Sequence, residues 1–328
     1  MKAIVVKEFG SPEQLQIVSL PDLTPATGQV VVDVHAAALN RADLLQRRGK
    51  YPPPKGESEI IGLECAGVVS SVGPDVTQVK VGDRVMALLA GGGYAEQVVI
   101  HQGMAIPIPK QLSFVEAAAV PEAFLTAREA LFTLGQLEGT SNVLIHAAAG
   151  GVGSAAVQLA KAAGATVFAT ASGSKIDRVK SFGADHVIDY KTQDFETIVN
   201  DVTQGKGVDV VVDFIGADYW PKHAKCLASG GRLVVVGVLG GANATVNLGA
   251  LLFKRHQILG LVMRSRSLAD KLAITQRFIR ESLPLFGQGT LKPVVDSVFP
   301  MHEVRAAHER MEKNENVGKI VLSMREDS

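Results

Sequence analysis

The chain has few cysteines and no net charge, and these two shortages exclude several classes of protein. Two cysteines, Cys65 and Cys226, among 328 residues cannot build a disulfide framework or a cysteine-based metal cluster. A reducing, cytoplasmic compartment is therefore expected. Lysine plus arginine and aspartate plus glutamate number 33 each, so no overall positive field gathers nucleic acid or an anionic membrane. We expect neither as a partner.

Long, purely apolar runs are also missing. The most apolar window, residues 143–160, contains His146, Ser154, Gln158 and three glycines. The first residues have the composition of a strand and reach Glu8 before any stretch of signal-peptide length. We therefore expect a protein without a membrane span.

The pattern along the chain changes character near residue 120. A length of 328 residues exceeds the size at which one core usually stops growing, so two domains are expected. Short β-rich runs separated by glycine turns predict a mostly antiparallel β domain over residues 1–123. Ser113 and Glu116 have the spacing of a capping box, which predicts that a helix begins there.

Residues 124–266 alternate buried strand patterns with helical ones. This alternation predicts an α/β domain with a doubly wound, six-stranded parallel sheet of the Rossmann type. The segment 267–328 returns to strand-like patterns, and we expect it to rejoin the β domain. The six predicted strands of the sheet lie within residues 143–148, 165–170, 186–190, 208–214, 231–239 and 257–263.

The stretch HAAAGGVG carries almost no side chain at the turn between the first of these strands and the next helix. A dinucleotide pyrophosphate binds backbone N–H groups at such a helix N-terminus, where bulky side chains would hold it away. Gly150, Gly151, Val152 and Gly153 are therefore predicted to bind the cofactor. The usual glycine spacing begins here with Ala148, so a tight structural turn is the alternative.

The end of the second strand predicts which dinucleotide binds. An NAD site usually has an acidic residue about 20 residues beyond the glycine motif, to bind the ribose 2′-hydroxyl. Here Ser172, Ser174 and Lys175 occupy that region, and no acid occurs until Asp177. These groups suit a 2′-phosphate and favour NADPH. The alternative is that Lys175 and Arg178 lie on a solvated helix face.

Several motifs together resemble the medium-chain dehydrogenase/reductase superfamily. They are GLECAGVV, VGDRV, LTAREAL, HAAAGGVG and GKIVL. Within it, NRADLLQRRGKYPPP, PEAFLTA, LLFKR and RSR are most similar to the NADPH:quinone oxidoreductases, especially the tumour-suppressor-inducible branch. The resemblance covers nearly the whole chain and implies a GroES-like fold for the β domain.

The chain departs from the zinc alcohol dehydrogenases of that superfamily. In those enzymes a histidine zinc ligand precedes the glutamate of the GLE motif, whereas this chain has Leu63. The position of a cysteine ligand is occupied by Asn40, and neither Cys65 nor Cys226 has a cysteine or histidine at zinc spacing. We expect no metal, and we expect the eight histidines to be surface or core groups.

The resemblance implies roles for three catalytic residues. Asn40 and Tyr51 match residues near the nicotinamide and the substrate in related quinone reductases, and Thr126 matches a threonine that approaches the nicotinamide. Asn40 and Thr126 are thereby also expected to contact the cofactor. From the residues alone, Asn40 is equally a turn residue, Thr126 a helix cap and Tyr51 a rim aromatic.

Further cofactor contacts are expected at the carboxyl ends of the later strands, where ligands lie in such sheets. The resemblance places Tyr190 beside the adenosine phosphate, and Gly216, after Asp213, on the nicotinamide ribose side. Arg264 either contacts cofactor or pairs with a carboxylate. The remaining expected contacts are Gly237, Leu239 and Lys319.

The expected reaction is hydride transfer from NADPH to a quinone, which needs little more than near-attack positioning of two reactive partners. One alternative is NADPH-dependent reduction of activated alkenes, such as enals or enoyl thioesters. Another is a low-turnover NADPH-binding protein of the lens-crystallin type. Related enzymes are homodimers joined through the sixth strands of their cofactor domains, so residues 244–260 are the expected interface.

Overall fold

The computed structural model describes residues 1–325, which divide into two compact units. The first unit consists of Met1–Leu125 and the described residues from Met263 onward, and the second of Thr126–Val262. Residues 326–328, the end of the third predicted segment, lie outside the described residues. The sequence prediction placed the divisions after residues 123 and 266, whereas the structure has them after residues 125 and 262. Arg264 therefore belongs to the first unit rather than to the second.

The first unit is built on a seven-stranded sheet in which only β14 and β15 pair in parallel among the described strands. The strand order is β14-β15-β3-β4-β5-β7, with β6 also paired to β3, and β1 and β2 form a separate antiparallel pair. The mostly antiparallel β domain and the return of the tail are thus confirmed. The strands are β1 (Lys2–Val6), β2 (Leu15–Ser19), β3 (Gln29–Ala38), β4 (Glu64–Val72), β5 (Arg84–Leu88), β6 (Gln97–His101), β7 (Ile106–Pro107), β14 (Val295–Pro300) and β15 (Lys319–Ser323).

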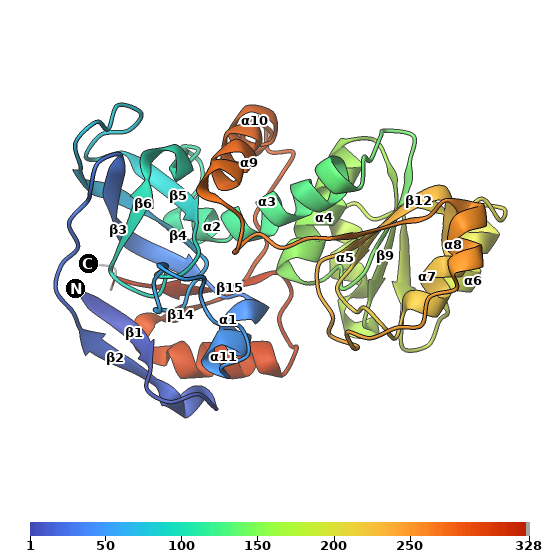
Figure 1. The fold of residues 1–328 in the computed structure, drawn as a ribbon, viewed down its shortest axis with the longest axis horizontal. Coiled ribbons are helices and arrows are strands. Elements are labelled where there is room, and N and C mark those ends of the chain that lie inside the picture. Colours follow the sequence, from blue (N-terminus) through green and yellow to red (C-terminus); the bar gives the residue numbers. More distant parts are fainter. Residues whose placement is uncertain (326–328) are drawn as a thin grey trace. The chain divides into compact units, whose positions relative to one another are not determined.

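Short helices connect and cover these strands (Figure 1). The predicted capping box is confirmed, because the Ser113 hydroxyl accepts a hydrogen bond from the Glu116 N–H at 3.2 Å and the Glu116 carboxylate accepts one from the Ser113 N–H at 2.9 Å. The helix α3 runs across the division between the units. The helices are α1 (Arg41–Arg47), α2 (Phe114–Ala118), α3 (Pro121–Arg128), α9 (Leu268–Glu281), α10 (Leu283–Gly287) and α11 (Val304–Glu312).

The second unit contains the predicted six-stranded sheet, with every neighbouring pair parallel. Its order, β10-β9-β8-β11-β12-β13, places the first strand in the middle. Successive strands are added on one side of β8 as far as β10 and then, from β11 onward, on its other side. In α/β sheets the point where the chain changes sides is where ligands bind. The strands are β8 (Asn142–Ile145), β9 (Thr166–Ala171), β10 (His186–Asp189), β11 (Val208–Asp213), β12 (Leu227–Val235) and β13 (Gln257–Gly260).

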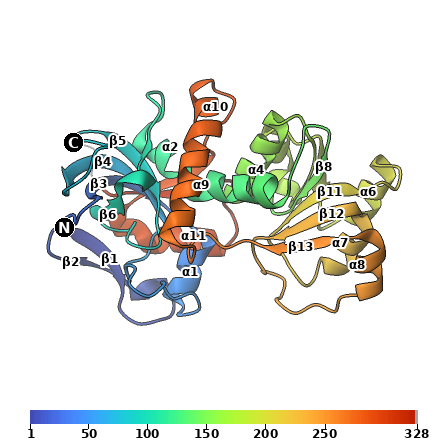
Figure 2. The ribbon, with the colours of Figure 1, turned by 45° about the horizontal axis from the view of Figure 1, so that its top comes forward.

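Helices cover both faces of this parallel sheet, as its buried β-branched strands require (Figures 1 and 2). On one face Phe168 of β9 and Val211 of β11 pack with Phe195 and Trp220 in a buried core. Among the described residues, no helix has both the length and the apolar character that crossing a membrane demands. The helices are α4 (Gly151–Ala162), α5 (Ile176–Ser181), α6 (Phe195–Val202), α7 (Trp220–Cys226) and α8 (Leu248–Lys254).

Candidate functional site

The glycine turn lies at the carboxyl end of β8, where Gly150 is the N-cap of α4. A Cβ atom on Gly153 would lie 2.3 Å from the Ala147 carbonyl oxygen, so only glycine fits there. A Cβ on Gly150 would meet nothing closer than 3.3 Å. Gly153 therefore has the structural role. The N–H of Gly150 donates to the Ala147 carbonyl at 2.9 Å, so the first N–H groups of the helix that suit an anionic phosphate are those of Gly151 and Val152.

The loops that follow β11 and β12 are bound to each other at the same edge of the sheet. Gly216 has a φ of +84°, and a Cβ there would lie 2.5 Å from the Gly241 carbonyl oxygen. The Leu239 N–H donates to the Phe214 carbonyl at 3.0 Å, and the Leu239 side chain is 63% exposed. Gly237 lies in the same pair of loops. The structure thus brings these predicted contacts to the edge that carries the glycine turn.

Ser172, Ser174 and Lys175 follow β9, in and just before a short 3-10 turn. The structure adds an acidic group that the sequence reasoning missed. A Cβ on Gly173 would lie 2.8 Å from Oδ2 of Asp189, which ends the neighbouring strand β10. The sequence held one signal for this contact: neighbouring parallel strands end at the same edge of a sheet, so an acid at the end of the third strand lies near the residues that follow the second. Tyr190 comes next and is 45% exposed.

In the first unit, Asn40, Glu64 and Lys319 form a buried polar cluster. The Lys319 ammonium donates to the carbonyl of Leu39 at 2.7 Å and to Asn40 Oδ1 at 2.6 Å, and it lies 2.6 Å from Glu64 Oε1. Asn40 Nδ2 donates to the same Glu64 oxygen at 2.9 Å. An ammonium group has three N–H bonds, and here each has an acceptor. A contact between Lys319 and a cofactor would require one of them to be released.

Three neighbouring strands bring this cluster together. Asn40 follows β3, Glu64 begins β4 and Lys319 begins β15. Because β3 pairs with both other strands, residues 279 positions apart in sequence come into contact. Asn40 also stands at the N-cap of α1, so it is a turn residue and a member of the cluster at once.

A second row of buried groups holds the backbone of Asn40. Asp43 Oδ2 accepts from the Asn40 N–H at 2.7 Å and from the Tyr94 hydroxyl at 3.2 Å. Tyr94 lies 3.4 Å from Nε2 of His308, whose Nδ1 lies 3.2 Å from Arg47. Arginine only donates, so His308 accepts at Nδ1 and donates at Nε2. Burial raises the pKa of Asp43 to about 7, and its Oδ1 has no hydrogen-bond partner within residues 1–325.

Tyr51 and Arg264 lie together in the first unit. The guanidinium of Arg264 is 5.1 Å from the centre of the Tyr51 ring. It donates to the carbonyls of Ala90 at 2.7 Å and Tyr51 at 3.0 Å, and to the Gln46 amide oxygen at 2.7 Å. Arg264 thus braces this part of the unit through neutral acceptors. Burial raises the pKa of Tyr51, so its hydroxyl keeps its proton and is able to donate.

Thr126 lies inside α3, five residues after its first residue, so it is not a helix cap. Its side chain is buried, at 4% exposure, and Oγ1 finds no hydrogen-bond partner in the part of the chain that the structure describes. Buried hydroxyls in native proteins normally have a partner. An orphaned hydroxyl at this position fits a polar group of a bound cofactor.

The positions that carry zinc ligands in the zinc alcohol dehydrogenases offer no metal ligand here. Leu63 is 2% exposed and apolar, and the Asn40 amide already bonds with Lys319 and Glu64. Cys65 and Cys226 are free and buried, and burial raises the pKa of each thiol to about 12. Neither is therefore a thiolate at neutral pH, the form that binds metal.

Two family models match the two kinds of domain. The model described as alcohol dehydrogenase GroES-like domain matches residues 26–110, and the model described as zinc-binding dehydrogenase matches residues 151–277. The second model is named for zinc-binding enzymes. This chain nevertheless has Asn40 and Leu63 at the positions where those enzymes have zinc ligands.

Full-length relatives share both domains. The human synaptic vesicle membrane protein VAT-1 homolog is 35% identical over 98% of this chain and 86% of its own length. A quinone oxidoreductase from Pseudomonas syringae has a structure 33% identical over 98% of this chain and 99% of that chain, with a TM-score of 0.87. The CurK enoyl reductase structure is 34% identical over 99% of both chains, with a TM-score of 0.89.

Proposed function

Because the chain belongs to the medium-chain dehydrogenase/reductase family, whose oxidoreductases bind a nicotinamide cofactor, we propose that it transfers hydride from NADPH to quinones without a metal ion. The observation that carries this proposal is the Asn40–Glu64–Lys319 cluster. In it, the neutral amide of Asn40 occupies a position where the zinc-dependent relatives have a ligand, and that amide is bonded to Glu64 and Lys319. A quinone is already electrophilic, so its reduction does not depend on a Lewis acid.

The described residues supply orientation and charge stabilisation. NADPH supplies the hydride when bound, and a proton from solvent completes the hydroquinone. Tyr51 keeps its hydroxyl proton and donates to a quinone oxygen as negative charge develops there. Asn40, fixed by Glu64 and Lys319, presents a rigid polar surface, and the orphaned hydroxyl of Thr126 binds the nicotinamide carboxamide.

The choice of NADPH is supported by Ser172, Ser174 and Lys175 at the end of β9. Lys175→Ala should weaken NADPH binding by about 1.5–3 kcal/mol, or roughly 10- to 150-fold, because a charge-assisted contact with the 2′-phosphate is lost. NADH binding should change little. Lys180→Ala is the matched control, since Lys180 lies on the next turn, is exposed and pairs with Asp177. If the affinities for NADPH and NADH fall equally, or if neither falls, Lys175 does not bind the 2′-phosphate. Asp189 would then favour NADH.

A second candidate is reduction of activated alkenes, which the similarity to the CurK enoyl reductase favours. That reaction uses the same cofactor but places the β-carbon of an enal or enoyl thioester at the hydride. It also requires polarisation of the carbonyl, for which Tyr51 is again suited.

Steady-state oxidation of NADPH and NADH tests both candidates. The acceptors are ortho- and para-quinones, an enal, an enoyl thioester and a secondary alcohol as the zinc-enzyme control, each with and without chelator. Turnover of quinones that prefers NADPH and ignores chelator supports the proposal. Turnover with an alkene alone replaces the reaction, and chelator-sensitive alcohol oxidation overturns the interpretation of Asn40 and Leu63. Binding of NADPH with no acceptor reduced indicates the low-turnover alternative.

We also propose a homodimer joined through the edge of the second unit. The strand β13 has a neighbour on only one side in the described sheet, and nearby Leu248, Leu252 and Phe253 are 71%, 71% and 83% exposed. Large exposed apolar groups beside an open sheet edge are typical of an interface. Light scattering should show a dimer that Phe253→Asp dissociates and Phe9→Asp, at a 75% exposed site in the first unit, leaves intact. A monomeric wild-type protein refutes this.

Cytoplasmic location and the absence of a nucleic-acid partner stay predictions. The balanced charge and the two free thiols support them. Fractionation of cells that express the tagged chain tests the location.

A further inference from the structure

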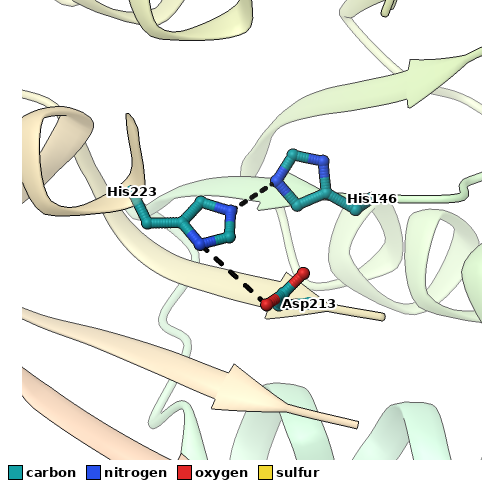
Figure 3. Close-up of side chains that lie close together, drawn as sticks. All are labelled: His146, Asp213 and His223. Atoms are coloured by element: carbon teal, nitrogen blue, oxygen red, sulfur yellow. Dashed lines mark hydrogen bonds and ion pairs between the residues drawn. The ribbon is translucent and has the colours of Figure 1, made fainter. Parts of the chain in front are cut away.

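Three buried side chains lie in a row at the carboxyl edge of the parallel sheet (Figure 3). His146 directly follows β8, Asp213 ends β11 and His223 is part of α7. The Nε2 atoms of the two histidines are 2.8 Å apart, and Nδ1 of His223 is 3.9 Å from Oδ2 of Asp213. On the far side of His146, Nδ1 lies 2.9 Å from the hydroxyl oxygen of Thr170. All three side chains are at most 1% exposed.

The carboxylate determines where the protons of the row lie. Burial raises the pKa of Asp213 to about 6, so its carboxyl is ionised at pH 7 and above and only accepts. At 3.9 Å, His223 Nδ1 is beyond hydrogen-bond distance of Asp213 and has no hydrogen-bond partner among residues 1–325, but the nearby negative charge favours a proton on that nitrogen. Nε2 of His223 then accepts from Nε2–H of His146, and Nδ1 of His146 accepts from the Thr170 hydroxyl. Burial lowers the pKa of His146 well below its usual range and that of His223 to about 3, so both rings are neutral. Every donor in the row points toward Asp213.

Two histidines and a carboxylate are metal-ligand types, and one ligand atom of each lies within 4.8 Å of the others, but the spacing found here is that of hydrogen bonding rather than of metal coordination. His223 turns a different ring nitrogen toward each neighbour, as Figure 3 shows. Two nitrogens at about 2.05 Å from a tetrahedral zinc ion are about 3.3 Å apart, whereas the 2.8 Å found here is a hydrogen-bond distance.

Asp213 connects the loops that follow β11 and β12. Its carboxylate accepts from the Ile215 N–H at 2.8 Å and from the Gly216 N–H at 3.0 Å. Its backbone carbonyl accepts from the N–H groups of Val236 at 2.7 Å and Gly237 at 3.2 Å. Asp213 thus contacts both loops that contain predicted cofactor contacts, the first through its side chain and the second through its backbone carbonyl.

At the other end of the row, His146 adjoins the glycine turn. Ala147 has a φ of +47°, a left-handed conformation that is unfavourable for a residue with a Cβ atom. Its carbonyl accepts from the Gly150 N–H at 2.9 Å and lies against Gly153. The His146 ring, which lies between Thr170 and His223, thus belongs to the residue that precedes this turn.

We propose that His223 is a positioning residue for the nicotinamide dinucleotide: it lies between His146, to which it is hydrogen-bonded, and Asp213, whose charge it faces at 3.9 Å, and so holds three cofactor loops in one geometry. These are the glycine turn after β8 and the loops after β11 and β12. The inference rests on the proposed use of a dinucleotide by the second unit, and it does not depend on which acceptor is reduced.

The first test is His223→Leu, with Lys222→Ala as the matched control on the same helix. Lys222 is half-exposed and pairs with Asp194, outside the row. His223→Leu should raise the dissociation constants of NADPH and NADH at least tenfold and raise KM for the cofactor, while kcat at saturating cofactor stays within threefold. The control should bind as the wild type does. Lowered thermal stability with unchanged cofactor binding would mean that His223 is merely structural and would overturn the proposal.

A milder pair of variants tests the far end of the row and protects against misfolding of His223→Leu. Thr170→Val keeps the shape and removes the hydroxyl, whereas Thr170→Ser keeps the hydroxyl. We expect Thr170→Val to bind dinucleotide about threefold more weakly and Thr170→Ser to bind normally. Equal binding by all three proteins overturns the proposal.

Nitrogen-15 NMR of the histidine rings tests the direction of the row without any substrate. At pH 8, where Asp213 is ionised, the wild type should show His223 protonated at Nδ1 and His146 at Nε2, with both rings neutral. A His223 proton on Nε2 would contradict the assigned direction. A wild type that binds NADPH but reduces no quinone would sink the proposed reaction alone, because the binding and NMR comparisons would be unaffected.

Discussion

Removal of the Lys319 ammonium is the sharpest test of the buried cluster in the first unit. The Lys319 and Glu64 side chains are 5% and 0% exposed, and the ion pair is 2.6 Å long. In Lys319→Met the Glu64 carboxylate would retain, of its partners in the described chain, the Asn40 amide and the N–H of Glu122, which donates to it at 2.8 Å. A buried negative charge would thus lose its counter-charge.

The expected loss is large. Removing one partner of a buried ion pair typically costs about 3–5 kcal/mol, because the other charge stays desolvated. For a unit of this size, each kcal/mol lowers the melting temperature by roughly 2–4 °C, so a fall of roughly 6–20 °C is expected. Calorimetry should show this fall in the transition of the first unit. Lys80→Met, which breaks an exposed pair with Asp83, should cost only about 0–1 kcal/mol.

A double variant separates charge from packing. In Lys319→Met combined with Glu64→Gln no uncompensated charge is left, so more than half of the lost stability should return. The reasoning is refuted if the single variant melts within 2 °C of the wild type, a threshold of about 1 kcal/mol. It is equally refuted if the double variant is no more stable than the single one, because packing would then account for the loss.

Three further changes test other parts of the molecule. Gly153→Ala would place a Cβ 2.3 Å from the Ala147 carbonyl oxygen, so it should cost about 1–3 kcal/mol and weaken NADPH binding; unchanged binding and melting would contradict the tight turn. Burial raises the pKa of Glu122 to about 8, so the folded state holds a proton that the unfolded chain releases above about pH 4.5. Stability is therefore lost as pH rises toward 8. Glu122→Gln should melt several degrees above the wild type at pH 8.5 and at the same temperature as the wild type at pH 4. An equal increase in melting temperature at both pH values would count against the raised pKa. Tyr51→Phe should lower kcat/KM for quinones roughly tenfold with no change in NADPH affinity, and unaltered steady-state kinetics would exclude the hydroxyl from the reaction.

Much of the fold was predictable because its signals are local. Each of the six parallel strands is a short apolar run between turn residues, and the capping box at Ser113 spans four residues. The glycine turn was readable for the same reason: a position with no room for a Cβ, such as Gly153, must be glycine wherever the rest of the chain lies. The parallel pairing of the strands followed from the alternation of strands and helices, since parallel strands need crossovers.

The chain by itself thus determined the elements, the turn that suits a phosphate and the lack of metal ligands at Asn40 and Leu63. Only the tertiary structure decided the partners of the functional side chains. It joined Lys319 to Asn40 across 279 residues and His146 to His223 across 77, and it placed Asp189 beside Gly173. Such pairs leave no periodic trace, because the distance between two side chains depends on strand order and loop path rather than on separation in sequence.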